Sequence, residues 1–244
     1  MRAQSSRLTL REREQSRQIL IVDDEEGTAA AISQLLETAG FTTVTVDAGL
    51  EALKELQASA PDLVIVTANL PDMEGVELVR QMRERSSLPL IAVSNVSEDR
   101  TEAVRALDAG ADDTVDRNAP PEELVARVGA LFRRIEWTPV SEPRLEVRQL
   151  SLDVARRIAY MQGRKLQLTP IEYSLLVTLM RSAGQVVPRD ELLKSVWPTS
   201  EPSDYAVLRV NISRLRVKLE ENPRRPTYII TVASRGYMMP AGRG

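Results

Sequence analysis

The chain contains neither cysteine nor histidine among its 244 residues. Disulfides, Cys/His zinc sites, Cys or His nucleophiles and imidazole general bases are therefore excluded. Because no nucleophile–base constellation remains, we expect a protein that is not an enzyme and needs no cofactor. No apolar run approaches the roughly 18 residues of a membrane span, and the Arg-rich N-terminus lacks the apolar region of a secretory signal. The sequence therefore predicts a cytoplasmic protein without a membrane partner.

Charge is divided unevenly along the chain. From Glu142 onward there are 17 Lys/Arg and 10 Asp/Glu, whereas residues 1–141 hold 15 and 25. An acidic half joined to a basic half suggests that only the second meets a polyanion, although chance variation between domains is the alternative. The length predicts two domains. We interpret residues 1–17, which are polar and basic without periodicity, as a disordered arm that adds at most weak attraction to DNA, with an over-long start site as the alternative.

Short apolar runs alternate with helical patterns from Gln18 onward. The runs are 19–22, 42–46, 63–67, 89–94 and 113–116, and the helical patterns are 28–39, 50–58, 76–84, 99–109 and 121–134. Nearly all-apolar strands alternating with amphipathic helices predict an α/β domain with a parallel sheet covered on both faces, over residues 18–134. Gly40 and Gly110 each follow a helical pattern, as glycines that end helices do.

Polar residues stand where these apolar runs end. In open parallel sheets, ligands bind at the carboxyl ends of the strands, near the point where the strand order reverses. The sequence therefore predicts that five side chains from four separated places converge at this edge. They are Asp23, Asp24, Thr67, Ser94 and Arg117.

The second half has a different pattern. Two prolines and no period mark residues 135–144 as a linker, and 145–240 form the second domain. Residues 145–167 read as short antiparallel strands. Thr169, Pro170 and Glu172 give the N-cap, first position and capping box of a helix, and 190–196 and 204–220 predict two more. The stretches 228–232 and 237–239 flank a turn at Gly236, which predicts a hairpin. Three helices followed by a terminal hairpin are the plan of a winged helix-turn-helix domain.

Motifs in both halves resemble the OmpR/PhoB family of two-component response regulators, over roughly residues 18–240. They are ILIVDDE at 19–25, PDLVIV at 61–66, LPDMEG at 70–75, AGADD at 109–113, LTPIEY at 168–173, ISRLRVKL at 212–219 and GY at 236–237. The resemblance implies a CheY-like doubly wound (βα)5 receiver domain and a winged-helix DNA-binding domain. Such proteins serve phosphorelay signal transduction and transcription regulation.

The resemblance also implies what a receiver pocket needs. An aspartate accepts a phosphoryl group, an acidic pair and a carbonyl hold magnesium, and a lysine and a hydroxyl contact the phosphoryl oxygens. Matched to the family, Asp23 and Asp24 are the acidic pair, Asn69 supplies the carbonyl and Ser94 is the switch hydroxyl. Four positions depart from the pattern: Thr67 stands for the acceptor aspartate, Arg117 for the lysine, Asn118 for the following proline and Thr114 for the aromatic switch.

These departures predict a pseudo-receiver without conventional aspartyl phosphorylation. Thr67 has no low-pKa oxygen and no histidine to activate it, Asp72 is displaced into the turn after the strand, and no magnesium site beyond a weak one at Asp23 and Asp24 is expected. Two interpretations of the retained acidic pair stay open. Arg117 pairs with both aspartates as an electrostatic latch, or the pair is inherited without use.

The family dimerises through its fourth helix, fifth strand and fifth helix, so the resemblance implies a homodimer here. The charged residues that fall in this region are Arg100, Arg105, Asp108, Asp112, Asp113, Arg127 and Arg134. A solvated charged face is the alternative. If the positions serve dimerisation, the receiver forms its dimer without phosphate.

The predicted helix 204–220 carries the expected DNA contacts. Leu208, Ile212, Leu215 and Leu219 recur at spacings of four, three and four and predict the buried stripe. An exposed helix with arginines suits the major groove, where Arg bonds guanine bidentately. The candidate DNA-binding residues are Trp197, Arg209, Asn211, Ser213, Arg214, Arg216, Lys218, Thr231 and Arg235. Arg214 is the expected base reader. Trp197 has a buried aromatic role as its alternative, and Ala233 stands where the family places a wing arginine.

We therefore expect an atypical response-regulator transcription factor that binds tandem half-sites of double-stranded DNA as a dimer and works with RNA polymerase. The degenerate pocket argues against a histidine kinase partner. The alternative is a regulator gated by a small molecule or a partner protein at this pocket. A more distant one is a substrate of a Ser/Thr kinase.

Overall fold

The computed structural model describes residues 17–94, 100–136, 144–197 and 205–241, except for the side chains of 100 and 134–136. The chain forms two compact units, and the division falls inside helix α6, after Val125. We describe each unit by itself. The predicted linker, 135–144, lies largely outside the described residues, so that domain boundary stays a prediction. None of the described helices is long and apolar enough to cross a membrane.

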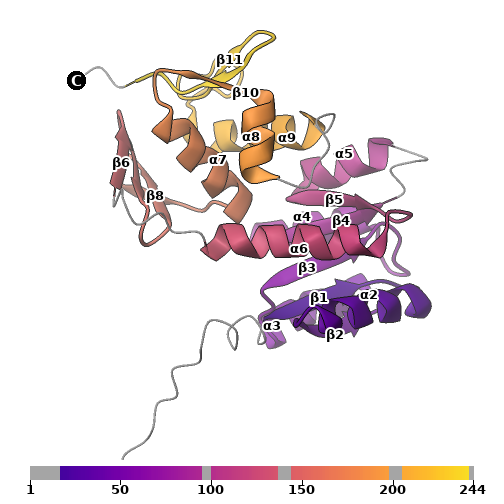
Figure 1. The fold of residues 1–244 in the computed structure, drawn as a ribbon. Helices are drawn as coiled ribbons and strands as arrows, with labels where there is room; N and C mark the ends of the chain where they lie inside the picture. The colour runs from indigo at the N-terminus through magenta and orange to yellow at the C-terminus, as the bar shows by residue number, and fades with distance from the viewer. Residues whose placement is uncertain (1–16, 95–99, 137–143, 198–204, 242–244) are drawn as a thin grey trace, which may run out of the picture. The chain divides into compact units, whose positions relative to one another are not determined.

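The first unit is built on a five-stranded parallel sheet with the order β2-β1-β3-β4-β5 (Figure 1). Its strands are β1 (Gln18–Val22), β2 (Thr42–Val46), β3 (Leu63–Thr67), β4 (Leu90–Ser94) and β5 (Asp113–Asp116). Its helices are α2 (Glu26–Thr38), α3 (Gly49–Ala58), α4 (Gly75–Arg85), α5 (Arg100–Ala109) and α6 (Pro121–Glu136), of which α6 runs on past the division. The doubly wound α/β fold is confirmed, and every predicted strand and helix is present.

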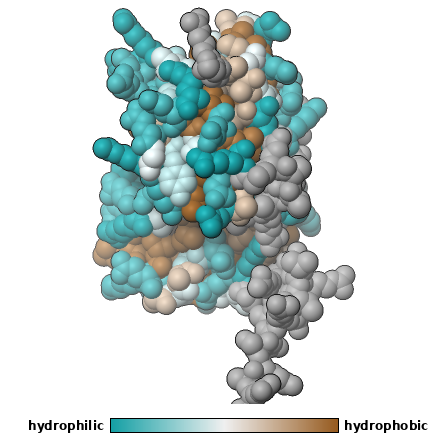
Figure 2. Space-filling model, turned by 90° about the vertical axis from the view of Figure 1, so that its left-hand side faces the viewer, coloured by the Kyte–Doolittle hydropathy of each residue, from teal (hydrophilic) through white to brown (hydrophobic). Residues whose placement is uncertain are grey.

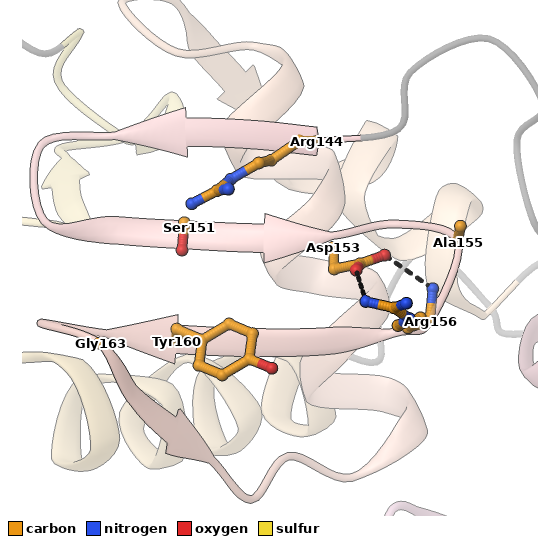
Figure 3. Close-up of a pocket in the computed structure, with 7 residues that line it drawn as sticks. All are labelled: Arg144, Ser151, Asp153, Ala155, Arg156, Tyr160 and Gly163. Carbon is orange, nitrogen blue, oxygen red and sulfur yellow. Dashed lines mark hydrogen bonds and ion pairs between the residues drawn. The ribbon is translucent and has the colours of Figure 1, made fainter.

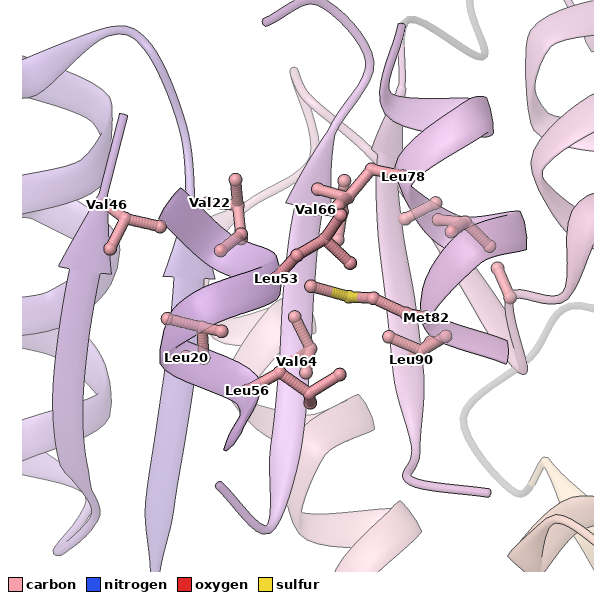
Figure 4. Close-up of a cluster of buried hydrophobic side chains, with 14 of the residues drawn as sticks. Leu20, Val22, Val46, Leu53, Leu56, Val64, Val66, Leu78, Met82 and Leu90 are labelled. Atoms are coloured by element: carbon pink, nitrogen blue, oxygen red, sulfur yellow. The ribbon is translucent and has the colours of Figure 1, made fainter. Parts of the chain in front are cut away.

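Alternate residues of the strands supply the core on one face of this sheet. Leu20, Val64 and Leu90 lie there with α3 and α4, which contribute Leu53 and Met82, and Figure 4 shows how these side chains interdigitate. The strand residues on the opposite face, such as Ile21 and Ile65, are equally buried. Burial on both faces explains why these strands are apolar without alternation. Each fully buried Leu or Ile contributes roughly 1.5–3 kcal/mol by the area it removes from water.

Two glycines end helices as predicted. Gly40 and Gly110 adopt φ values of +94° and +141°, which side chains with a Cβ rarely adopt. A Cβ added to Gly110 would also lie 2.8 Å from the Cβ of Arg83. Glycine is therefore needed at position 110 for two reasons: the backbone is left-handed there, and it packs closely against α4.

After the end of α6, the second unit has a four-stranded antiparallel sheet of order β6-β7-β8-β9, followed by three helices and a second sheet. Its elements are β6 (Arg144–Val147), β7 (Leu150–Asp153), β8 (Ile158–Met161), β9 (Arg164–Leu166), α7 (Pro170–Arg181), β10 (Val186–Pro188), α8 (Arg189–Val196), α9 (Tyr205–Leu219), β11 (Ile230–Val232) and β12 (Gly236–Met238). The predicted hairpin is β11–β12. Strand β10 was not predicted, and it pairs with β12 to make the hairpin three-stranded. The unit is a winged-helix domain.

The start of α7 forms the predicted capping box. The Thr169 hydroxyl accepts a hydrogen bond from the Glu172 backbone N–H at 3.3 Å, and the Glu172 carboxylate accepts one from the Thr169 N–H at 2.8 Å. Two backbone donors that a helix start leaves unsatisfied are thereby paired. Because both residues are buried, the cap also fixes α7 within the core of the unit.

Hydrophilic residues cover much of the face shown in Figure 2. Among the residues that the structure describes, three large hydrophobic side chains are exposed, namely Leu50, Val104 and Val217. Isolated exposed hydrophobic residues are normal on protein surfaces. Val217 lies on α9, the helix that is predicted to carry the DNA contacts.

Candidate functional site

The polar residues predicted at the strand ends converge at the carboxyl edge of the first sheet. The register pairs Val22 with Val66, Thr67 with Val93 and Ser94 with Asp116, so the residues that follow these strands are neighbours. The Thr67 hydroxyl donates to the Val22 carbonyl at 3.1 Å. The Arg117 backbone N–H donates to the Ser94 carbonyl at 2.9 Å. We call the group of Asp23, Thr67, Ser94 and Arg117 the strand-end pocket.

Arg117 forms ion pairs across this pocket. Its guanidinium lies 3.2 Å from Asp23 Oδ1 and 3.3 Å from Glu25 Oε2. The predicted pairing with Asp23 is therefore present, but the second partner is Glu25 and not Asp24, which is exposed and forms no ion pair with Arg117. The side chain of Asp23 has no exposed surface, whereas that of Arg117 is 31% exposed.

Asp23 is the member of this pair whose charge is disfavoured by burial. Burial raises the pKa of Asp23 above its ordinary 3.8, even though the Glu25 backbone N–H and the Arg117 charge act to lower it. Burial disfavours the charged form of a carboxyl group, so the counter-charge of Arg117 offsets only part of that cost. Oδ2 of Asp23 and Oγ of Ser94 are buried without a hydrogen-bond partner in the described structure.

Helix α4 holds Thr67 in place from the other side. A Cβ added to Gly75 would lie 2.1 Å from the Thr67 carbonyl oxygen, so only glycine lets the helix approach this closely. The nearby Asp72 carboxylate accepts hydrogen bonds from the backbone N–H groups of Gly49 and Leu50, both at 2.8 Å. These bonds lower the pKa of Asp72. Asp72 thus serves the start of α3, in agreement with its displacement from the pocket.

The remaining receiver positions take less part in the pocket. Asn69 is exposed and its backbone bridges to Glu74. Thr114 is half-buried in β5, opposite Ala92, and Asn118 donates its backbone N–H to Asp116. In the described parts of the chain no group of three or more Asp or Glu residues is arranged to hold a metal. With Arg117 on Asp23 Oδ1, the residues present do not fit a magnesium ion.

The residues predicted at a dimer interface have different surroundings. Arg105 forms an exposed ion pair with Glu74 at 2.8 Å, and Asp108 is exposed. Asp113 accepts a hydrogen bond from the Thr114 N–H at 2.9 Å. Asp113 and Arg127, which lies on α6, are both buried, and the side chains of Arg100 and Arg134 lie outside the described residues.

Asp112 needs a correction because it is fully buried within the first unit. Its Oδ2 accepts hydrogen bonds from Arg83 at 2.8 Å and from the Leu90 backbone N–H at 3.0 Å. Arg83 also donates to the carbonyls of Gly110 and Leu88, and so joins α4 to the loops before β4 and β5. This structural arginine was not predicted, since its partners lie far away in sequence. We therefore remove Asp112 from the predicted interface.

Helix α9 buries the predicted stripe. Leu208, Ile212, Leu215 and Leu219 are all buried, whereas Arg209 and Ser213 are exposed and Arg214 is half-buried. Val217 is 68% exposed and continues the Arg209–Ser213 face at the same spacing of four. That spacing, extended one more turn, would have identified Val217 from the sequence.

Three other predicted contacts of this region are engaged inside the domain. Asn211 is wholly buried and donates to the Val207 carbonyl, so we withdraw it as a base contact. Lys218 donates to the Gln167 carbonyl and pairs with the buried Glu172. Trp197 is 1% exposed, which favours its buried aromatic role.

Arg216 links α9 to the hairpin. It donates to the Ile229 carbonyl at 3.0 and 2.7 Å and to the Thr231 hydroxyl at 2.7 Å. Burial lowers the pKa of Arg216, although Tyr237 and Glu220 act in the opposite sense. Thr231 and Arg235 are exposed on or beside the hairpin. Arg216 therefore holds the hairpin against the helix in addition to any contact with DNA.

A second pocket of about 670 Å³ lies on the four-stranded sheet (Figure 3). Arg144 and Arg156 face it, but each already pairs with a neighbouring carboxylate, Glu146 at 2.7 Å and Asp153 at 3.5 Å. Tyr160 lines the same pocket from β8. Because the charges in this pocket neutralise one another, we assign it no ligand.

Comparisons with known proteins match both units. The response regulator receiver domain matches residues 19–129, and the C-terminal domain of transcriptional regulatory proteins matches 163–239. The DNA-binding response regulator MtrA of Mycolicibacterium smegmatis is 37% identical and covers 90% of this chain and 95% of its own. The alkaline phosphatase synthesis regulator PhoP of Bacillus subtilis is 34% identical, over 92% of this chain and 97% of its own.

A solved structure of a RitR mutant is 28% identical, with a TM-score of 0.73, and covers 93% of this chain and all of its own. The receiver fold, the winged-helix domain and the whole-length similarity all agree. The chain belongs to the OmpR/PhoB-type DNA-binding transcriptional response regulators.

Proposed function

We propose that this regulator binds DNA as a dimer whose formation does not require aspartyl phosphorylation. The observation that carries the proposal is the ion pair between Arg117 and Asp23, beside a strand end that presents Thr67. In this proposal the pocket is a pseudo-receiver site. Arg117 supplies permanently the positive charge that a metal ion would bring to the acidic residues.

Phosphotransfer to Thr67 has little chemical support. A hydroxyl needs a neighbouring base to become a nucleophile, and Thr67 donates its proton to the Val22 carbonyl, which is not a base. Asp72 is committed to the backbone of α3. Magnesium, which neutralises the transferring phosphoryl group, would have to displace Arg117 from Asp23.

The sign of the effect that loss of Arg117 has on stability follows from the burial of Asp23. Asp23 is buried, so removal of its counter-charge leaves a carboxylate that is desolvated and uncompensated. The retained acidic pair is then used by only one of its members, because Asp24 is solvated. The alternative, inheritance without use, agrees with the exposure of Asp24. It does not account for the ion pair that Arg117 forms with Asp23 across the edge of the sheet.

We place the homodimer contact on the face formed by α5, β5 and α6. Of the predicted residues, Arg105 and Asp108 are exposed there, Arg100 and Arg134 are kept by their position alone, and Asp113 and Arg127 are buried within the single chain and so are not counted as surface pairs. Exposed charged pairs contribute roughly 0.2–1 kcal/mol each, so several are needed for a stable dimer. Dimerisation would present two α9 helices to tandem half-sites about one helical turn apart, or roughly 34–36 Å.

DNA contact is assigned to the exposed side of α9, with Arg209, Ser213 and Arg214, and to Thr231 and Arg235 of the hairpin. The support is the exposure of Arg209, Ser213, Thr231 and Arg235 together with the net positive charge of this half of the chain, and the half-buried Arg214 is kept as the expected base reader. In this role the protein recruits or blocks RNA polymerase at promoters in the cytoplasm, and it needs no histidine kinase.

A second candidate function is gating by a small molecule. It is favoured by the two buried polar atoms without partners in the described structure, Asp23 Oδ2 and Ser94 Oγ. A ligand with a hydrogen-bond donor for each would satisfy both. A thermal shift screen of the full chain against metabolites tests this, because one stabilising ligand that fails on an Arg117→Ala variant would favour gating.

The deciding experiment is the molar mass of the full chain by light scattering, over a tenfold concentration range. Samples are compared with and without magnesium and acetyl phosphate. A dimer that forms equally in both conditions supports the proposal. A monomer that dimerises only with the phosphodonor contradicts it, and mass spectrometry would then locate the acceptor. A monomer in both conditions favours gating by a ligand or partner.

A further inference from the structure

An acidic groove of about 730 Å³ runs beside α2 and the edge strand β2. Ala29, Ala30 and Val46 are among the small apolar residues that line it. The carboxylates that line it come from β1, α2, β2 and α3 or the residues that follow them. They are Asp23, Asp24, Glu26, Glu37, Asp47 and Glu51, and none of the described residues that line the groove is a Lys or Arg.

Within the described part of the chain, the exposed carboxylates of this groove have no counter-charge. Among the residues that the structure describes, none of Asp24, Glu26, Asp47 and Glu51 forms an ion pair, and Glu37 accepts hydrogen bonds only from hydroxyl groups. Elsewhere in the unit, exposed Glu74 and Glu77 pair with arginines of the same unit. Like charges this close repel one another, so the groove would be stabilised by a polycation.

Asp23 gives a second and independent indication of a ligand. It lines the groove, is 2% exposed, and has a buried Oδ2 atom without a hydrogen-bond partner in the described structure. Buried carboxylate oxygens are nearly always paired, because desolvation without a hydrogen bond is costly. Oδ1 of Asp23 is already engaged by Arg117 and the Glu25 backbone. The remaining oxygen can accept from a cationic donor.

The chain itself carries a cationic segment next to one end of this groove. Residues 1–16, which lie outside the described residues, contain Arg2, Arg7, Arg11 and Arg13 against two glutamates, and Arg17 follows. The Arg17 carbonyl accepts hydrogen bonds from the Thr42 N–H and hydroxyl at 2.9 and 3.0 Å. The adjacent Thr43 hydroxyl donates to Glu37 of the groove at 2.8 Å. The arm therefore leaves the domain beside the Glu37 end.

We propose that residues 2–16 dock in the acidic groove of their own chain. Helix α2 has 13 residues and so is about 20 Å long, whereas 15 extended residues reach about 50 Å, so the arm can follow the whole groove. Arginines pair with the exposed carboxylates along the way. Leu8 and Leu10 supply the apolar side chains that the small floor residues can contact. Docking withdraws the arm from solvent and from nucleic acid.

The test is the rate at which an arginine-specific protease removes the arm from the full chain, followed by mass spectrometry. The groove variant is Glu37→Lys with Asp47→Lys, one substitution toward each end of the groove. The matched control is Glu84→Lys with Glu221→Lys, two exposed positions outside the groove with the same change of net charge. Lysines add no cleavage site for this protease. Thermal melts establish that all three proteins are folded.

We expect the groove variant to lose its arm about threefold to tenfold faster than the wild type, as the loss of two exposed ion pairs implies. The control should be cleaved at the wild-type rate, and 0.5 M salt should speed cleavage of the wild type but not of the groove variant. Should Glu37→Lys with Asp47→Lys unfold, Glu37→Gln with Asp47→Asn replaces it, with a smaller increase expected.

Equal cleavage of wild type and groove variant overturns the proposal. An increase of the same size in the control also overturns it, because net charge alone would then explain the effect. Protection that grows with protein concentration in the wild type overturns docking within one chain, and assigns the groove to the arm of a second copy.

Discussion

Arg117 and Asp23 lie 94 residues apart in sequence and 3.2 Å apart in space, with the arginine partly in solvent and the aspartate wholly buried. Parallel strands bring their carboxyl ends to one edge, which is why two residues so distant in the chain can meet. Asp23 depends on Arg117 more than the reverse, because Arg117 has Glu25 as a second partner. This asymmetry sets the first prediction.

Arg117→Ala should lower the free energy of unfolding by about 1–3 kcal/mol at pH 7, since it leaves a buried carboxylate without its counter-charge. In the Asp23→Asn background the same change should cost far less, because no buried charge remains. Urea unfolding of the four proteins measures this as a double-mutant cycle. A coupling energy near zero would favour inheritance without use over the latch.

The pH dependence of stability follows from the raised pKa of Asp23. A carboxyl whose pKa is higher in the folded protein binds its proton more tightly there, so this group favours folding below its unfolded pKa and loses that advantage as pH rises through the folded pKa. The wild type should therefore lose stability relative to Asp23→Asn as pH rises from about 4 toward neutrality. Urea midpoints at half-unit pH steps test the sign, and a rise with pH would contradict it.

Arg83→Ala should destabilise the receiver unit much more than Arg80→Ala, on the same helix. Arg83 compensates Asp112, which is fully buried, whereas Arg80 pairs with Glu77 on the surface. We expect a loss of about 3–5 kcal/mol for the first change, against at most about 0.5 kcal/mol for the second. Chemical unfolding of both variants measures the difference. Equal effects would mean that burial of Asp112 is not decisive.

Arg209→Ala and Arg216→Ala should weaken DNA binding for different reasons. Arg209 is exposed on α9, so its loss should reduce the dependence of the binding constant on salt, by roughly one phosphate equivalent if it contacts the backbone. Arg216→Ala should in addition lower the thermal stability of the domain, because three hydrogen bonds to the hairpin are lost. Fluorescence anisotropy and melts on the same samples separate the two, with Lys165→Ala as an exposed control.

Local sequence signals predicted most of the fold. The apolar runs, the helix ends at Gly40 and Gly110 and the capping box at Thr169 each depend on residues within a few positions of one another. Strand β10 escaped prediction because three residues, Val186–Pro188, have no readable period and become a strand only by pairing with β12.

Roles that depend on distant partners were less accessible. Asp112 lies in a motif that favours an interface. It is nevertheless buried, and its partner is Arg83, 29 residues earlier in the chain. The arginines of α9 look equivalent in sequence, and only the position of the Ile229 carbonyl separates Arg216 from Arg209. The convergence at the strand-end pocket could be predicted, since it follows from the parallel sheet itself. The choice of Glu25 over Asp24 could not, because it depends on how the loop after β1 turns.

The bonds from Arg216 to Ile229 and Thr231 have a consequence for engineering. Attempts to retarget a regulator usually exchange the residues of the reading helix one at a time. Here such an exchange at Arg216 would release the hairpin. An alanine scan would then attribute the loss of DNA binding to a lost base contact, although a structural contact had been removed. A graft that is meant to recognise a new operator has to carry α9 and β11 together, as one transplantable part.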